Sequence, residues 1–256
     1  KDADITIKEK KSHEDYDASF PDLRRKLKFK NEEVILVVSG AGSISGGILR
    51  LAEQLKNNNL RVIYVQPDLS LMSETQKMQE RIVRNVLQEY ARSGVFSKIY
   101  LIDNLAIEKS IGDVSIIGYY DTINQAIVNT IHMINVFENS EPVIGNFITP
   151  HEIARIATVG VVILDDENED EKENWFYDLT MPRDVVYYYG IGKDDLNNDG
   201  TLFRRINQFV KSKVEEGLNV SYGVFETSYE QKYCYCIKYS SVVQSYAELL
   251  DSQDIG

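Results

Sequence analysis

The first candidate for ligand binding along the chain is a glycine-rich run. Residues 39–47 read Ser-Gly-Ala-Gly-Ser-Ile-Ser-Gly-Gly and directly follow the apolar run Val34–Val38. Between a buried strand and the start of a helix, such a loop can point backbone N–H groups at an anion, assisted by the helix dipole. Glycine suits this role because a Cβ would block a phosphate or forbid the required φ angles. The run lacks the lysine of a P-loop and the spacing of a dinucleotide fingerprint, so a plain tight turn is the alternative.

A histidine and a cysteine pair are further candidates, and both have simpler explanations. His151 lies between Pro150 and Glu152 and could be a general base, but no Ser or Cys nucleophile accompanies it. A surface or interface role is therefore favoured for this histidine. Cys234 and Cys236 lie one residue apart on a predicted strand and project to the same face. Two cysteines cannot form a zinc site alone, so core packing is favoured.

An acidic run in the second half resembles the front of a calcium loop. Residues 195–200 read Asp-Leu-Asn-Asn-Asp-Gly, which places oxygen ligands at alternate positions. The twelfth position is Ile206, where a bidentate carboxylate belongs. We therefore favour a polar turn, with Thr201 capping the following helix, and assign no metal ligands.

Strands that alternate with helices must position these residues in the first half of the chain. The predicted strands are Val34–Val38, Arg61–Val65 and Lys98–Ile102. The predicted helices are a short one after Pro21, Ile48–Lys56, about 73–91 with Met78 and Ile82 on its apolar face, and about 114–137. The alternation predicts parallel pairing with right-handed crossovers, and hence a doubly wound, mostly parallel α/β sheet. The unbroken β-branched run Val34–Val38 predicts a strand buried on both faces.

The last of these helices is expected to be the long central element of the fold. An apolar stripe on it would comprise Tyr120, Ile123, Ile127, Ile131 and Ile134. Residues 1–20, in contrast, are polar and irregular, with no firm period.

The pattern changes after Pro142 and predicts a smaller α+β domain. A short helix from Pro150 to Arg155 and an acidic, solvated loop at 165–173 are expected. The other predicted elements are the strands Val159–Leu164, Val185–Gly190, Val220–Thr227 and Lys232–Tyr239 and the helix Leu202–Glu216. Alternating residues in the last two strands suggest an antiparallel hairpin. We place the domain boundary between residues 137 and 138, so that 1–137 and 138–256 form the two domains.

The composition is that of an ordinary globular protein. The chain has 256 residues, of which 43% are hydrophobic and 27% charged. Its net charge of −12 argues against nucleic acid or an anionic membrane as the main partner, and the basic run at 24–30 is interpreted as a solvated helix face. No apolar stretch approaches the roughly 20 residues that span a bilayer. No secretory signal opens the chain, which starts at Lys1 and leaves room for an upstream segment. The expected location is the cytoplasm.

Taken in order along the chain, these features resemble the tubulin/FtsZ superfamily. Gly40-Ala-Gly-Ser-Ile-Ser-Gly46 is similar to its glycine-rich phosphate loop, two glycines short. Leu101-Ile-Asp-Asn104 resembles the loop whose Asn contacts guanine. Tyr120-Asp-Thr-Ile-Asn124 resembles the start of the central helix, where an aromatic stacks on the base and an Asn reads its edge. This is physically sound, because positions i and i+4 share a helix face, an aromatic offers a π surface and an amide both donates and accepts.

The resemblance extends from about residue 21 to residue 240 and implies a guanine-nucleotide site. It implies GTP or GDP as the cofactor and leaves Mg²⁺ open. The residues implied to contact phosphate are Gly40, Gly42, Ser43, Ser45 and Gly46, and those implied to hold the base are Asn104, Tyr120 and Asn124. The implied partner is a second copy of the chain, associated head to tail. The compact loops are most similar to those of phage-encoded members such as PhuZ, which would place the protein in a host-cell cytoplasm.

Three departures from the family pattern bear on activity. Ile44 stands where the family has glycine, and its β-branched side chain is expected to crowd the phosphates. Ile148-Thr-Pro-His-Glu-Ile-Ala154 resembles the loop that reaches the next subunit's nucleotide and activates water with two acidic residues. Here Thr149 replaces the first acid, and Glu152 is the surviving catalytic candidate. The family's first glycine loop and opening strands lie upstream of anything that matches, so residues 1–137 would be an N-terminally incomplete nucleotide-binding domain.

These features support three hypotheses about the function of the protein. The first, which we take as the prediction, is a protein that binds guanine nucleotide and assembles head to tail into filaments, with slow or no hydrolysis. The second is an active GTPase of a dynamic filament, with Glu152 as its acid. The third is a degenerate structural scaffold without nucleotide. Tyr120 and Asn124 favour the first two readings, whereas Ile44 and the missing upstream loop favour the third.

Overall fold

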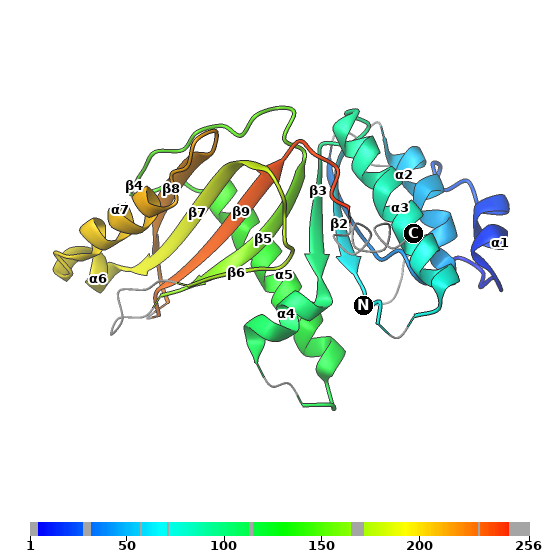
Figure 1. Cartoon of the computed structure of the whole chain (residues 1–256), viewed down its shortest axis with the longest axis horizontal. Coiled ribbons are helices and arrows are strands. Elements are labelled where there is room, and N and C mark those ends of the chain that lie inside the picture. The colour runs from blue at the N-terminus through cyan, green and yellow to red at the C-terminus, as the bar shows by residue number, and fades with distance from the viewer. Residues whose placement is uncertain are drawn as a thin grey trace, which may run out of the picture.

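The N-terminal half of the chain builds a parallel sheet with helices on both faces (Figure 1). The computed structural model describes residues 5–27, 32–56, 58–70, 72–112, 115–164, 172–229 and 231–245. Strands β1 (Glu33–Val38), β2 (Asn59–Gln66) and β3 (Lys98–Asp103) pair in parallel, and β3 pairs in parallel with β5 (Ile156–Ile163). One face is covered by α2 (Ile48–Leu55) and α3 (Glu74–Arg92), and the other by α4 (Asn104–Ile111) and α5 (Tyr119–Glu138).

The second half continues the same sheet. Its strand order is β1-β2-β3-β5-β9-β7-β8-β4, with β6 beside β5. The strands not yet defined are β4 (Ile144–Gly145), β6 (Lys172–Trp175), β7 (Pro182–Gly192), β8 (Asn219–Thr227) and β9 (Tyr233–Ser240). The remaining helices are α1 (His13–Ala18), the 3₁₀ turn η1 (Ser43–Gly47), α6 (Lys193–Asn198) and α7 (Leu202–Ser212). None of the helices in the described part of the chain is long and apolar enough to cross a membrane.

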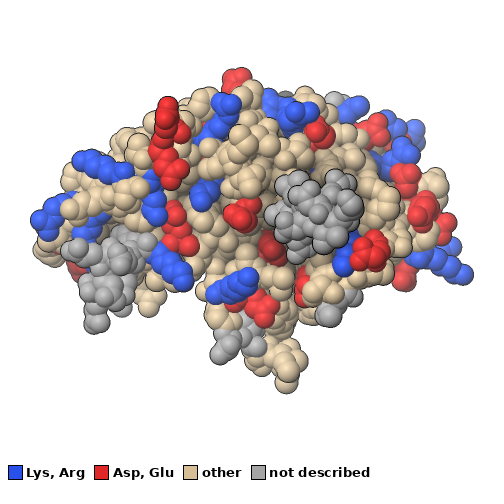
Figure 2. All heavy atoms as spheres, viewed as in Figure 1, with Lys and Arg blue, Asp and Glu red and all other residues tan. Residues whose placement is uncertain are grey.

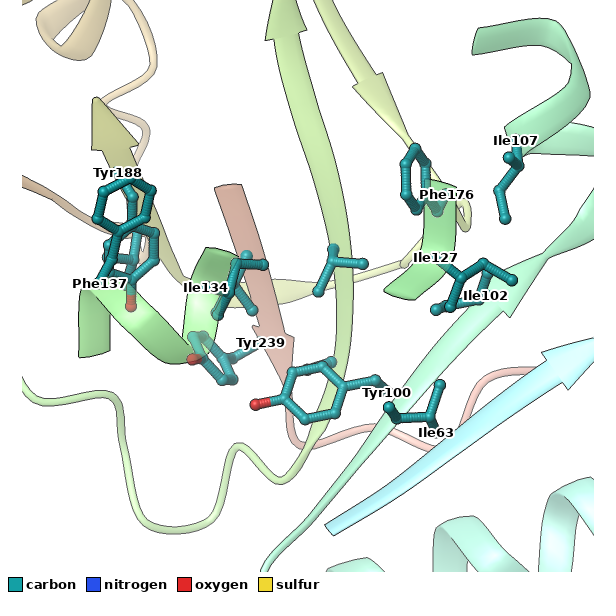
Figure 3. Packing of buried hydrophobic residues seen from close by; sticks show 14 of the residues in the cluster. Ile63, Tyr100, Ile102, Ile107, Ile127, Ile134, Phe137, Phe176, Tyr188 and Tyr239 are labelled. Atoms are coloured by element: carbon teal, nitrogen blue, oxygen red, sulfur yellow. The ribbon is translucent and has the colours of Figure 1, made fainter. Parts of the chain in front are cut away.

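Helix α5 packs against both halves of this sheet. Its buried residues Ile127, Ile134 and Phe137 belong to the core shown in Figure 3. That core contains Ile63, Tyr100 and Ile102 from the N-terminal strands and Tyr188 and Tyr239 from β7 and β9. The mixed α/β fold with a long central helix is therefore confirmed. The domain boundary after residue 137 stays a prediction.

Strand β1 differs from its prediction. Its residues alternate in burial, and the side chains of Ile35 and Val37 are 46% and 60% exposed. Among the described strands β1 pairs with β2, and it stands at the end of the strand order. An unbroken apolar run therefore marks an edge strand here, with one face packed near α2 and the other facing solvent.

The pairing and loop predictions for the second half also need correction. Strands β8 and β9 do not form a hairpin, because β7 lies between them, parallel to β8 and antiparallel to β9. Residues 165–171 of the predicted acidic loop lie outside the described residues. Glu173, predicted in that loop, lies in β6, and its carboxylate is 3.2 Å from Lys213 Nζ.

Several helix predictions are wrong in detail. A helix forms at His13–Ala18, in the segment predicted to be irregular, whereas a turn follows Pro21. The segment 150–155 forms turns and no helix. Met78 and Ile82 of α3 and Tyr120 of α5 are exposed, although each was assigned to an apolar face. The buried face of α3 instead includes Glu80 and Arg84, a buried ion pair with an N···O distance of 3.2 Å.

Candidate nucleotide-binding site

Parallel strands bring the glycine loop and Asn104 to one edge of the sheet. The glycine loop follows β1, and Asn104 follows β3. The register pairs Val38 with Tyr64, and Gln66 with Asp103, so these strands end near one another. In open α/β sheets, ligands bind outside the carboxyl ends of the strands. We call this place the carboxyl edge.

The glycine loop has a buried part and an exposed part. A Cβ on Gly40 would lie 2.1 Å from the Tyr64 hydroxyl, and one on Gly46 would lie 1.9 Å from the His13 carbonyl oxygen. Packing within the chain therefore requires glycine at both positions. Gly42, in contrast, is exposed and has open space around it, apart from Ile44 Cγ2 at 3.9 Å. The exposed residues of the loop are Ser39, Gly42, Ser43 and Ile44. That Ile44 crowds a phosphate stays a prediction.

At the carboxyl edge, three buried polar atoms have no hydrogen-bond partner among the residues that the structure describes. They are Ser45 Oγ in the loop after β1, Gln66 Oε1 at the end of β2 and Asn104 Oδ1 directly after β3. Leaving a buried donor or acceptor unpaired costs roughly 1–3 kcal/mol, so such groups need an explanation. Because these atoms are closed to solvent, a ligand at this edge could pair with them only after the loop or the side chains shift. Sequence reasoning missed Gln66, whose only signal is a polar residue at the end of a buried strand.

The predicted base-binding residues lie on the outer surface of α5. The Tyr120 side chain is 74% exposed, and Asn124, one turn later, is also exposed. The Tyr120 ring packs edge-on against Tyr119, with centroids 5.3 Å apart. The Tyr119 hydroxyl donates a 2.8 Å hydrogen bond to Glu108 of α4, and this bond raises the pKa of Tyr119. Tyr119, missed by sequence reasoning, therefore ties the start of α5 to the helix that begins at Asn104.

The carboxyl edge also carries negative charge. Asp103 caps α4 by accepting a 2.9 Å hydrogen bond from the Leu105 amide. Burial raises the pKa of Asp103, and the charges of Asp68 and Glu80 raise it further. Within the described residues no group of three or more His, Cys, Asp or Glu side chains could hold a metal ion.

Glu152 lies at the opposite edge of the sheet. The 149–155 segment enters β5, and Ile156 at the start of β5 is in register with Ile99 near the start of β3. Strand β3 ends at the carboxyl edge, so Thr149 and Glu152 lie far from Asn104 and are both exposed. The structure thus separates the catalytic candidate from the other predicted site residues.

Two side chains missed by sequence reasoning anchor this segment. Asp184 at the start of β7 is buried and accepts a 3.0 Å hydrogen bond from the His151 amide. It accepts another 3.0 Å bond from Asn219 Nδ2 at the start of β8. The hydrogen bond between His151 and Asp184 joins residues 33 positions apart in the chain, so no local sequence pattern predicts it.

The prediction of a polar turn is wrong for most of the calcium-like run, because residues 195–198 lie in helix α6 and a turn forms only at residues 200 and 201. The Lys232 Nζ lies 3.8 Å from carboxylate oxygens of both Asp195 and Asp199, and Arg205 is 3.0 Å from Asp199. Ile206 is 1% exposed and packs in the core beneath α7. The Thr201 hydroxyl donates to Asp199, so the expected side-chain cap is not formed.

Cys234 and Cys236 are free and buried in the core that lies beneath α7. The prediction that they serve core packing is confirmed.

Comparison with known proteins identifies the arrangement of elements. No protein-family model and no curated protein sequence matches the chain. The GTPγS-form protofilament of Bacillus thuringiensis serovar israelensis TubZ is 16% identical, with a TM-score of 0.65 over 87% of this chain and 66% of that one. CetZ from Methanosaeta thermophila is 14% identical, with a TM-score of 0.58 over 89% of this chain and 64% of that one. The empty FtsZ dimer of M. jannaschii is 10% identical, with a TM-score of 0.56 over 85% and 66%.

The similarity to these structures is one of fold. The chain spans just under two thirds of the length of the TubZ and CetZ chains. These structures leave the likeness to phage-encoded members as a prediction. The order of strands and helices that they share with this protein agrees with the resemblance found in the sequence, and the chain therefore has the tubulin/FtsZ fold.

Proposed function

We propose that the chain binds a guanine nucleotide at the carboxyl edge and associates head to tail into filaments, with slow or no GTP hydrolysis. The observation that carries the nucleotide proposal is the set of three unpartnered polar atoms, Ser45 Oγ, Gln66 Oε1 and Asn104 Oδ1, at the ends of parallel strands. The similar TubZ structures are described as GTPγS and GDP forms, which supports guanine nucleotide as the ligand class.

The residues at this edge fit a nucleotide with its phosphates on the glycine loop. Gly42 and Ser43 are exposed and would face phosphate, while Ser45 and Asn104 have atoms in need of partners. Asp68 and Asp103 would repel phosphate, so we expect Mg²⁺ or another cation to accompany it. On the outer face of α5, Tyr120 would stack on the base and Asn124 would read its edge.

Exposed apolar residues at both ends of α5 support head-to-tail association. Just before its first residue, Ile116 and Ile117 are 94% and 92% exposed. The start of α5 projects from the body of the molecule (Figure 1). Beyond its last residue, Val143, Ile148 and Ile153 are 63%, 47% and 56% exposed. Twenty helical residues separate the two sites by roughly 30 Å. Two different patches at opposite ends suit a heterologous contact, which propagates as an open filament unless curvature closes it.

The surface charge is consistent with self-association as the main interaction. Figure 2 shows Lys and Arg interspersed with Asp and Glu over the face in view, without one continuous basic surface. This agrees with a net charge of −12, which disfavours nucleic acid and anionic membrane. The cytoplasmic location stays a prediction.

Slow hydrolysis follows from the segment expected to meet the neighbour's nucleotide. Thr149 carries no charge and is a poor base, so Glu152 alone would orient water. Ile44 beside Gly42 would disturb the preorganised N–H groups of the phosphate loop. We expect Thr149→Asp to raise phosphate release under assembling conditions, and more so together with Ile44→Gly.

Calorimetric titration tests the nucleotide proposal directly. GDP should bind more tightly than ATP, because an amide matched to guanine leaves unpaired groups against adenine at about 1–3 kcal/mol each. Asn124→Ala should remove this preference, whereas Asn129→Ala, also exposed on α5, should retain it. Equal affinities for both nucleotides in the wild type would show that the base assignment is wrong.

The scaffold without nucleotide is the second candidate. The carboxylates of Asp68 and Asp103 at the carboxyl edge favour it, because they oppose phosphate in the absence of a cation. Filaments that form equally well without nucleotide, in a protein that binds neither GDP nor GTP with Mg²⁺, would establish it.

A further inference from the structure

His151 and Asp184 form a pair in which a buried carboxylate holds an exposed imidazole. His151 Nδ1 lies 3.0 Å and 3.1 Å from the two carboxylate oxygens of Asp184. The Asp184 side chain is 3% exposed, whereas the His151 side chain is 46% exposed. The carboxylate therefore fixes one edge of the ring and leaves the other edge, with Nε2, toward solvent.

The contacts also select the tautomer of the ring. An ionised carboxylate only accepts hydrogen bonds, so Nδ1 must carry the proton that points at Asp184. The alternative, in which Asn219 Nδ2 donates to Nδ1, has a longer distance of 3.5 Å, and Asn219 already donates to Asp184 at 3.0 Å. With Nδ1–H bound to Asp184, Nε2 has the free lone pair and can accept a proton.

This imidazole lies at the edge expected to meet a neighbouring molecule. Ser240 of β9 is in register with both Ile156 and Pro182, so the starts of β5 and β7 lie at one level of the sheet. His151 precedes the first of these strands, and Asp184 lies in the second. In a head-to-tail contact, this edge would face the carboxyl edge of the next molecule.

We propose that His151, positioned by Asp184, is the proton acceptor for hydrolysis of the nucleoside triphosphate held by the neighbouring subunit. The proposal rests on the nucleotide binding and head-to-tail association proposed above. A water oxygen would form the new bond to the terminal phosphorus, and the bond from that phosphorus to the β–γ bridging oxygen would break, which releases the nucleoside diphosphate. The water proton would pass to Nε2 and then to solvent. Glu152, the next residue, would orient the water, and the imidazole would accept the proton that Thr149 cannot, so that of the two outcomes allowed above the inference selects slow hydrolysis over none.

The test compares phosphate release with assembly in the same samples. With GTP and Mg²⁺, His151→Ala should lower phosphate release by about 100-fold, a typical effect of losing a general base. Sedimentation of the filaments should change little. His132→Ala, which removes an exposed histidine of α5, should alter neither quantity. Added imidazole should restore part of the lost release in His151→Ala, because the side chain lies at the surface.

Asp184 acts through the histidine, and a spectroscopic readout tests that role. Nitrogen chemical shifts of the neutral His151 ring should show the proton on Nδ1 in the wild type and a mixture of tautomers in Asp184→Asn. Absence of GTP binding or of filaments would overturn the proposed function and this inference with it. Filaments whose phosphate release is unaffected by His151→Ala, or undetectable in the wild type, would overturn this inference alone.

Discussion

The buried polar groups at the two edges of the sheet differ in whether they have hydrogen-bond partners. At the strand-start edge, the buried carboxylate of Asp184 accepts hydrogen bonds from the His151 amide, the His151 ring and Asn219. At the carboxyl edge, Ser45 Oγ and Asn104 Oδ1 are buried and find no partner within the described part of the chain. Unfolding returns polar groups of both kinds to water, so a satisfied group stabilises the fold and an unsatisfied one opposes it. The difference agrees with our proposal that the carboxyl edge holds a ligand, whereas the strand-start edge holds its own chain.

The substitution expected to change stability most is at Asp184, on the strand-start edge. Asp184→Ala should lower the free energy of unfolding by about 2–3 kcal/mol, because it removes a buried acceptor of several charge-assisted hydrogen bonds. Urea unfolding followed by circular dichroism measures the change. Glu141→Ala, at an exposed residue near the end of α5, is the control and should change stability by less than about 0.5 kcal/mol. If Asp184→Ala lowered the free energy of unfolding no more than the control does, the hydrogen bonds to Asp184 would not stabilise the strand-start edge.

Two glycine substitutions in the loop should separate an effect on stability from an effect on nucleotide binding. Gly46→Ala should cost about 1–3 kcal/mol, because its Cβ would meet the His13 carbonyl and force a backbone shift. Gly42→Ala should leave the stability of the free protein almost unchanged and instead weaken nucleotide binding. Thermal unfolding with and without GDP separates the two effects. Equal losses of stability would mean that both glycines serve the fold.

Removing an unpartnered polar atom should change stability in the opposite direction. Ser45→Ala deletes a buried hydroxyl oxygen without a partner, so we expect the free protein to gain about 1 kcal/mol. The added stabilisation by saturating GDP should shrink. Chemical denaturation of both proteins, with and without ligand, gives the two differences. A Ser45→Ala protein that is less stable without ligand would contradict the assignment of this edge to a ligand.

The smallest expected effect is a pH dependence at the carboxyl edge. The pKa of Asp103 is raised in the folded chain, so the unfolded chain releases this proton at lower pH. Its contribution to stability should therefore decrease as pH rises from the ordinary carboxyl value of 3.8 through the raised value. Asp103→Asn should flatten this part of the stability curve measured in denaturant. An unchanged curve would show that the pKa of Asp103 is not raised in the folded protein.

The sequence predicted the elements that are defined by local patterns. The glycine loop, the three parallel strands and α5 follow from apolar runs, helical periodicity and turn residues over fewer than about 20 residues. Their order was sufficient for the fold, because parallel strands with crossover helices allow few arrangements. It was also sufficient to bring Ser45 and Asn104 to one edge.

Features that depend on distant contacts could not be predicted. Alternation in β8 and β9 is the same whether they pair with each other or with β7, so the hairpin was wrong. The buried Glu80 and Arg84 of α3 look like an exposed helix face in the sequence, and Arg84 Nη1 in fact donates to the Gln244 carbonyl at 2.7 Å. That contact spans 160 residues.

The open side of β1 has a practical consequence. Among the described strands β1 pairs only with β2, and Ile35 and Val37 beside its open side are exposed. Such a strand edge is a template on which other extended chains can add. In concentrated solutions of this chain we therefore expect disordered aggregation to begin at β1 and to compete with ordered polymerisation. A lysine in place of Val37 would act as a gatekeeper against such growth and would leave the ends of the molecule untouched.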